Sequence, residues 1–181
     1  MPPSSLLAVI RLSRRFRRNR RGSSAVEFAL VAPMFIAMLF AMLETALVFF
    51  AGQMLEIGTQ DTARLLFTNQ AQGTLNGQQF HDNLCARVSA LMTCANLYVD
   101  VKSFSSFTAI TSADLADPID GGGNLVNNFT YPTPNPGDTV VVRAFYAWPI
   151  YVTKLGYNLS NMSGNKRLLS ATAAFQVEPG P

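Results

Sequence analysis

The chain has 181 residues, of which 14 are Lys or Arg and 11 are Asp or Glu, so its formal net charge is +3. The charge is unevenly placed, because seven arginines precede Gly22 and all eleven acidic residues follow it. Residues 23–181, with seven basic and eleven acidic residues, therefore have a net charge of −4. This balance argues against nucleic-acid binding, and the length leaves room for one small domain after a membrane segment.

The first membrane signal is the apolar run that follows the arginines. Residues 28–43 contain no charge, and after Glu44 the chain is again uncharged through Ala51. A helix needs roughly 20 apolar residues to cross about 30 Å of hydrocarbon, so this run is long enough to span a membrane. Because basic residues mark the cytoplasmic side, we expect a cytoplasmic N-terminus and an exported remainder.

A signal-peptidase site fits this run poorly. A cut after Ala46 would place Glu44 at position −3, and a cut after Ala51 would place Phe49 there, whereas small residues are needed. The apolar segment is therefore predicted to stay on the mature protein.

The residues around Gly22 resemble a type IV prepilin leader, since the basic run ends at Gly22, two serines follow, and Glu27 stands five residues past the glycine. In more detail, the chain looks like the TadE-like minor pilins, or pseudopilins, of tight-adherence (Flp) pilus systems. The motifs that carry this resemblance are Arg20–Pro33, Leu43-Glu44, Gln53–Glu56, Ala63-Arg64 and the C-terminal Ala171–Pro179.

The resemblance implies a function and a set of partners. A prepilin peptidase would cut after Gly22, Ser23 would become the new N-terminus, and Glu27 would pair with the freed amine of a neighbouring subunit. Other pilin subunits and the inner-membrane assembly platform would be partners, in support of pilus biogenesis, surface adhesion and biofilm formation. The protein would lie in the bacterial inner membrane with a periplasmic domain, or outside the cell in the pilus.

Two other interpretations stay open at this stage. The chain could be an uncleaved, signal-anchored envelope protein that binds a partner without entering a pilus. Glu27 could also be a carboxylate favoured by the helix macrodipole at the N-terminus.

Glu44, roughly 25 Å further along the helix, is expected either to reach water at the far membrane boundary or to contact a partner helix.

We expect an α+β fold with three parts: a basic leader (1–22), the transmembrane and assembly half of a long helix (23–55), and a periplasmic pilin-like domain (56–181). The long helix should run from about Ser24 to residue 66, with a kink or local loosening at Pro33. A polar turn at 69–79 should precede a second helix. Its apolar stripe is Phe80, Leu84, Val88, Leu91 and Met92.

The remainder is predicted to form three or four antiparallel strands packed on the exported half of the long helix. Alternation predicts a strand at 97–102, and the best strands are 139–148 and 167–177. Residues 104–138, rich in Gly and Pro, are read as a long irregular connection with one short strand at 107–110. Tyr146, Trp148 and Tyr151 are interpreted as core or edge filling in preference to a binding patch.

The two cysteines, Cys85 and Cys94, are both in the exported part and are expected to form a disulfide in an oxidising periplasm. A metal site with His81 is disfavoured because no fourth ligand is evident. His81 also lacks a partner for general-base work, since Asp82 is adjacent and should point elsewhere on a helix. No catalytic residues and no cofactor are predicted.

Overall fold

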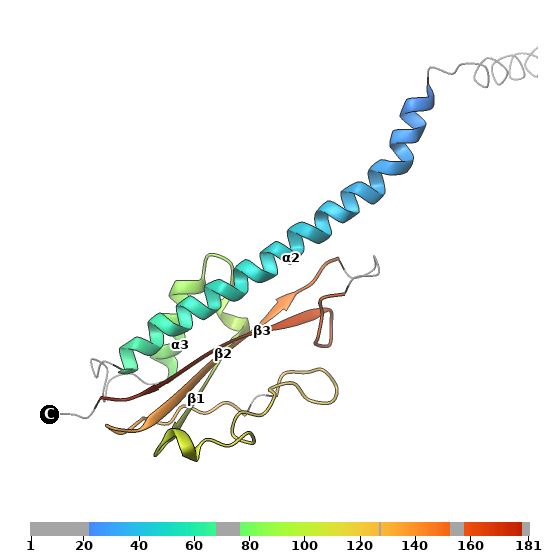
Figure 1. Cartoon of the computed structure of the whole chain (residues 1–181). Coiled ribbons are helices and arrows are strands. Elements are labelled where there is room, and N and C mark those ends of the chain that lie inside the picture. Colours follow the sequence, from blue (N-terminus) through green and yellow to red (C-terminus); the bar gives the residue numbers. More distant parts are fainter. Residues whose placement is uncertain (1–21, 68–76, 127, 153–157, 179–181) are drawn as a thin grey trace, which may run out of the picture. The chain divides into compact units, whose positions relative to one another are not determined.

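The computed structural model describes residues 22–67, 77–126, 128–152 and 158–178. These residues form helix α2 (Ser23–Phe67), helix α3 (Gly77–Val88) and strands β1 (Leu97–Phe104), β2 (Thr139–Pro149) and β3 (Lys166–Gln176) (Figure 1). Short 3-10 turns lie at Cys94–Asn96 and Phe107–Ala109. The predicted α+β fold, a long helix with a second short helix and an antiparallel sheet, is confirmed. The chain divides into two compact units, Met1–Met42 and Leu43–Pro181.

Helix α2 is a single 45-residue element, as its sequence predicts. Leu, Met, Ala and Glu are frequent along it, and these side chains lose little rotamer freedom in a helix. Pro33 lies inside the helix without ending it. The helix therefore passes from the first unit into the second, where it becomes part of the domain core.

The sheet has the order β1-β2-β3, and both strand pairs are antiparallel. In the register, Val142 of β2 lies opposite Val101 on one side and Ala173 on the other. The run of valines at the start of β2 suits a strand that is covered on both faces. Pro149 ends β2, as expected, because it has no N–H for the ladder.

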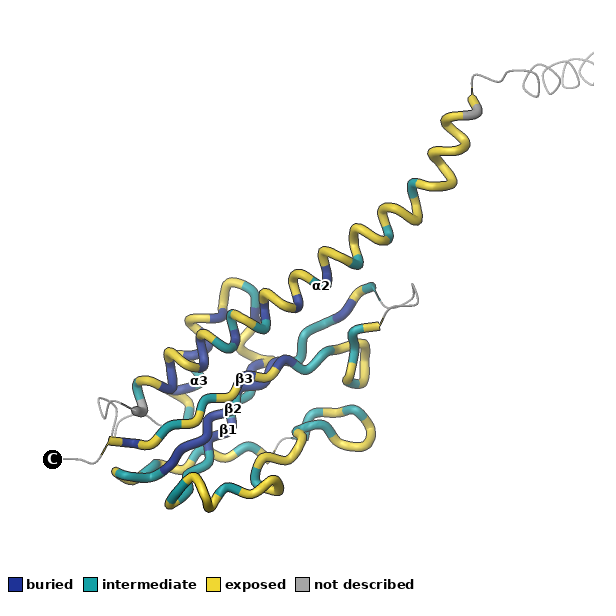
Figure 2. Tube along the Cα trace, in the orientation of Figure 1, coloured by how far each residue is buried: buried dark blue, intermediate teal, exposed yellow. Residues whose placement is uncertain are grey.

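The main core lies between the two helices and one face of the sheet (Figures 1 and 2). The stripe predicted for the second helix is confirmed for Phe80, Leu84 and Val88, which are buried in this core. Leu91 and Met92 also pack in or against the core, but they lie in the turn after α3 ends at Val88, so the predicted helix is too long. From α2, Ala51 and Leu55 are fully buried in the same cluster.

Gly58 of α2 sets how closely the two helices approach. A Cβ atom built there would lie 3.1 Å from Val88 Cγ1 and 3.2 Å from Leu84 Cδ1, so a larger residue would press on α3. Next to it, the buried hydroxyl of Thr59 donates to Leu55 O at 2.7 Å, and that of Thr62 donates to Gly58 O at 2.7 Å. Both polar side chains are thus satisfied within α2 and need no partner from the sheet.

The other face of the sheet is covered by the long connection that follows β1. Arg143 of β2 pairs with the buried Asp100 of β1, with an Nη2–Oδ2 distance of 2.6 Å. Arg143 Nη1 also donates to Ala116 O at 3.0 Å, and the N–H of Thr130 donates to Asp100 Oδ1 at 3.1 Å. This buried ion pair therefore holds the long connection at two places, Ala116 and Thr130. Phe129 adds a stacked ring contact with Phe145.

The short strand predicted at 107–110 is wrong, because this stretch contains the 3-10 turn Phe107–Ala109. The edge of β1 that such a strand would use is occupied, since Val101 N donates to Thr130 O at 2.8 Å. The sheet described here therefore has three strands.

Turns in the connection are held by aspartates. Asp138 accepts hydrogen bonds from Asn135 N at 2.9 Å and from Ser103 Oγ at 2.8 Å. Asp120 accepts from the N–H groups of Gly122 and Asn124, each at 2.8 Å. These bonds lower the pKa of both carboxyls below the usual value, because they stabilise the charged form. The largest contribution comes from the backbone N–H of Asn135 for Asp138, and from the backbone N–H of Asn124 for Asp120.

Cys85 at the end of α3 forms a disulfide with Cys94, and their Cα atoms are 5.5 Å apart. We predict that the double change Cys85→Ser and Cys94→Ser lowers the free energy of unfolding by about 2 to 3 kcal/mol, because the reduced chain gains loop entropy. Denaturant unfolding of the detergent-solubilised protein measures this loss. Ser89→Ala, an exposed change inside the same loop, is the control. Reactive thiols at both positions in the native protein would contradict the bridge.

Candidate functional site

Helix α2 carries the surface on which a membrane function depends. Within the described ranges, one helical stretch, Ser24–Leu65, is long and apolar enough to cross a membrane. Its large apolar side chains from Val26 to Phe50 are 43% to 78% exposed, except Val48. Figure 2 shows this part of α2 as almost continuously exposed. Such a surface fits a single-pass membrane anchor.

The residues of the expected processing site lie at the start of this helix. Gly22 is exposed, and Ser23 is the first residue of α2. A Cβ atom at Gly22 would meet no other atom within 4 Å, so the fold does not demand glycine there. Glu27 is exposed, four residues after Ser23 and therefore on the same face of the helix. Residues 1–21 of the basic leader (1–22) lie outside the described residues, and processing and assembly stay predictions.

Glu44 is the second carboxylate of the apolar half of α2, and it is 8% exposed. Its Oε1 accepts a hydrogen bond from the backbone N–H of Tyr151 at 2.6 Å. The N–H of Val152 lies 3.2 Å from Oε1 and 3.1 Å from Oε2. We call this arrangement, the Glu44 carboxylate with these two N–H groups, the Glu44 clamp. Charge-assisted bonds of this kind are roughly twice as strong as neutral ones.

The clamp joins two parts of the chain that are 107 residues apart. Pro149 ends β2, so the next backbone N–H groups leave the ladder and need other acceptors. Glu44 supplies acceptors for two of them. The helix is thereby tied to the chain that leaves the sheet.

This arrangement contradicts one of the two alternatives for Glu44, that its carboxylate reaches water. The sequence suggested that the carboxylate reaches water or contacts a partner helix, but in the structure it is buried against the backbone of its own chain. The reason is physical: a carboxylate near a membrane boundary is costly unless donors surround it, and two N–H groups of the same domain are available. A separate contact of Glu44 with a partner stays untested.

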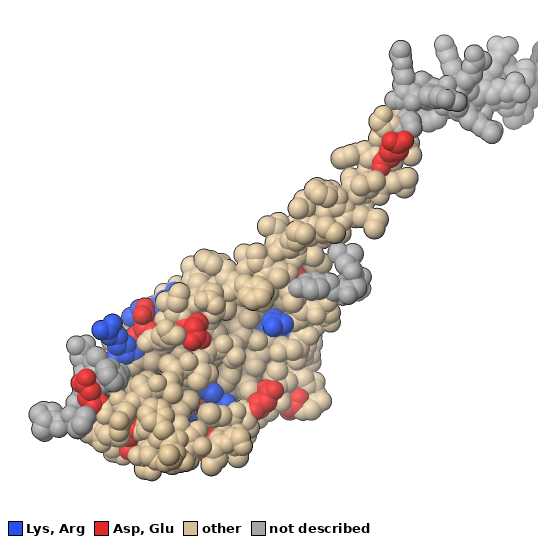
Figure 3. All heavy atoms as spheres, viewed as in Figure 1, with Lys and Arg blue, Asp and Glu red and all other residues tan. Residues whose placement is uncertain are grey.

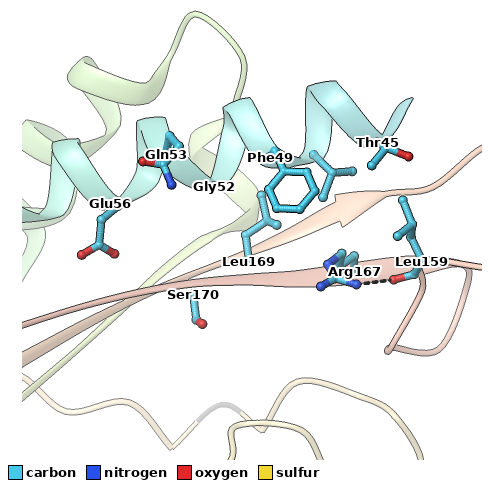
Figure 4. Close-up of a pocket in the computed structure, with 10 residues that line it drawn as sticks. Thr45, Phe49, Gly52, Gln53, Glu56, Leu159, Arg167, Leu169 and Ser170 are labelled. Atoms are coloured by element: carbon cyan, nitrogen blue, oxygen red, sulfur yellow. Dashed lines mark hydrogen bonds between the residues drawn. The ribbon is translucent and has the colours of Figure 1, made fainter. Parts of the chain in front are cut away.

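A groove of about 320 Å³ lies between α2 and β3 (Figure 4). Its middle is apolar at Phe49 and Leu169, Arg167 lies at the end near Thr45, and Glu56 lies at the other end. The guanidinium of Arg167 donates from Nη1 to Leu159 O at 2.9 Å. The other lining residues are Val48, Gly52, Gln53 and Ser170. Sequence reasoning missed this groove, because its two walls are more than a hundred residues apart.

The aromatic residues at the end of β2 do not share one role. Tyr146 is 4% exposed and Trp148 is partly buried against the core, as core filling requires. Tyr151 differs, because its side chain is 83% exposed while its N–H group is held by the Glu44 clamp. Core filling is therefore wrong for Tyr151.

His81 also differs from its predicted surroundings. Its Nδ1 lies 3.2 Å from Asp82 Oδ1, so the adjacent carboxylate does reach the ring, contrary to the expectation from helix geometry. Its Nε2 lies 3.2 Å from Cys94 O. The ring thus joins the carboxylate next to it in α3 to the carbonyl of one disulfide cysteine. The described residues contain no group of three or more His, Cys, Asp or Glu side chains that could hold a metal ion.

The described residues thus form a small antiparallel sheet packed on the second half of a long helix whose first half is apolar and exposed. Comparison with known families is more specific: residues 22–64 match the family described as TadE-like protein. This match confirms the resemblance that the N-terminal motifs indicate. No curated protein and no solved structure matches the chain.

We predict that Glu44→Gln weakens the clamp, because the amide keeps one acceptor oxygen but turns an NH₂ group toward backbone donors. The expected loss in free energy of unfolding is about 1 to 3 kcal/mol. Exchange of the Tyr151 and Val152 amide hydrogens, measured by mass spectrometry in detergent, should accelerate roughly tenfold.

Glu56→Gln is the matched control for this test. Glu56 is also on α2, but it is partly exposed and its Oε1 accepts from Gln60. Its loss should leave exchange at residues 151 and 152 unchanged. Equal exchange in wild type and Glu44→Gln would show that the clamp does not hold this segment in solution.

Proposed function

We propose that this chain is a TadE-like minor pilin or pseudopilin of a tight-adherence (Flp) pilus system. In this proposal a prepilin peptidase removes the basic leader after Gly22. The mature protein then stays in the bacterial inner membrane through α2, with its α+β domain on the periplasmic side. It joins other pilin subunits and the assembly platform, and so supports pilus biogenesis, adhesion and biofilm formation.

The observation that carries the proposal is the extent of the family match. It begins at residue 22, where the basic run ends, and continues to residue 64 through the apolar part of α2. The matched region is thus the part of the chain expected to be recognised, inserted and assembled. The domain beyond it lies outside the match, and its partners are inferred from the helix alone.

The charge distribution supports the proposed topology. Seven arginines precede α2, and no further Lys or Arg occurs until Arg64. In Figure 3 the basic side chains of the described residues gather on the domain, and the visible surface of the N-terminal part of α2 carries only one acidic patch. The positive-inside rule then places the leader in the cytoplasm.

The position of Glu27 supports a role in assembly. Removal of the leader would leave a free amine on Ser23, whose pKa in ordinary peptides is about 7.7 to 8.0. Glu27 lies one helical turn away and is exposed, so it is on the surface that an adjacent subunit would approach. Pairing between subunits would fix their axial register.

We predict that Gly22→Val blocks processing, because the peptidase must accept an extended backbone with almost no side chain at the residue before the cut. Mass spectrometry of the membrane-extracted protein should find Ser23 as the first residue of the wild type and a full-length variant. The fold itself should tolerate the change, since no atom lies within 4 Å of the added Cβ.

Gly52→Val is the control for this substitution, because a Cβ there also meets no neighbour within 4 Å. This variant should be processed normally. Normal processing of Gly22→Val would remove the leader assignment. A wild-type protein that keeps Met1 in cells carrying the peptidase would favour the uncleaved, signal-anchored alternative.

We further predict that Glu27→Gln, which keeps the shape and removes the charge, is processed and inserted as the wild type is but fails to support pilus formation. Pili are counted by electron microscopy in cells where the variant is the only copy. Glu178→Gln, an exposed change near the end of the chain, should leave piliation intact. Normal piliation with Glu27→Gln would leave this residue as a helix-end carboxylate.

A further inference from the structure

The Glu44 clamp leaves Tyr151 in an unusual position. The backbone of this residue is fixed by a 2.6 Å bond to a buried carboxylate, yet its side chain is 83% exposed. The Tyr151 ring is therefore outside the core, while its backbone is held in place. A side chain in this position is suited to contact another molecule.

The helix at the same level is apolar and exposed. Leu43, Leu47 and Phe50 are 58%, 49% and 59% exposed. No charged residue occurs between Glu44 and Glu56, and the Glu44 carboxylate itself is enclosed. This end of the second unit therefore presents aromatic and aliphatic side chains and no exposed charge from the helix.

The distance along α2 relates this level to a membrane. Twenty residues separate Ser24 from Glu44, and at 1.5 Å per residue they span about 30 Å, the thickness of the hydrocarbon core. If the hydrocarbon begins near the N-terminus of α2, Glu44 lies at its far boundary. The clamp then holds the backbone of Tyr151 at that same depth.

We propose that residues 151–152 contact the lipid surface on the exported side, with the Tyr151 ring in the headgroup region. Tyrosine is enriched at this boundary because its ring is apolar and its hydroxyl remains hydrated. Arg167 lines the groove beside Thr45 and Phe49, so a guanidinium is available at nearly the same level for lipid phosphates. The Glu44 clamp thus sets how close the domain lies to the membrane.

This inference rests on the proposed membrane anchoring of α2. The test uses the full chain in single-copy nanodiscs of phosphatidylcholine and phosphatidylglycerol, with the only tryptophan removed by Trp148→Phe. Into this background Tyr151→Trp, Phe107→Trp and Phe35→Trp are introduced one at a time. Phe107 is 55% exposed in the long connection, and Phe35 is 58% exposed in the apolar half of α2. An intact disulfide and unchanged circular dichroism verify folding.

Lipids brominated near the glycerol end of the chain should reduce the emission of Tyr151→Trp, and the same ring should be protected from iodide. Phe107→Trp should show the opposite behaviour, and Phe35→Trp should be quenched by lipids brominated deep in the chain. Adding Glu44→Gln to Tyr151→Trp should reduce its lipid quenching, because the backbone is no longer held.

The outcomes separate the two proposals. If Phe35→Trp is quenched by lipid while Tyr151→Trp behaves as Phe107→Trp does, the membrane contact is wrong and the anchor stands. If Phe35→Trp is not quenched by lipid, the anchor itself fails. Unchanged quenching of Tyr151→Trp after Glu44→Gln would overturn the role of the clamp.

Discussion

The carboxylate of Glu44 is the contact that ties helix α2 to the chain leaving the sheet. It lies in a helix segment with no other charge from Thr45 to Leu55, and it is stabilised by two backbone N–H groups from the far end of β2. Charge-assisted hydrogen bonds from these N–H groups offset part of the cost of removing the carboxylate from water. The same contact leaves Tyr151 exposed. One side chain thereby links the apolar helix, the end of the sheet and the surface of the domain.

Much of the fold could be predicted because its signals are local. The length of the apolar run and the absence of strong helix breakers, apart from Pro33, define α2, and the stripe of Phe80, Leu84 and Val88 defines α3. Alternation and β-branched residues define the strands near their observed bounds. The family match covers residues 22–64, where most of the motifs that carry the resemblance lie.

The features that sequence reasoning missed depend on contacts between distant segments. Backbone N–H groups have no signature in a sequence, so nothing marks Tyr151 and Val152 as partners of Glu44. The same holds for the groove, whose walls come from α2 and β3. At 107–110 the local pattern suggested a strand, but the edge of β1 is occupied by Thr130, whose carbonyl accepts from Val101 N. At such a position a contact between distant segments outweighs the local strand propensity.

The buried pair of Asp100 and Arg143 has a consequence for the variability of the chain. Asp100 accepts from Thr130 N and Arg143 donates to Ala116 O, so the chain between these two residues is a loop whose ends are both fixed. Doubling the length of such a loop would cost only about 0.6 kcal/mol of closure entropy. At the tip only Gly121 is open, since an added Cβ there meets no neighbour, while Gly123 accepts from Ser163 N at 2.7 Å; a single substitution at Gly121 should therefore leave the fold unchanged.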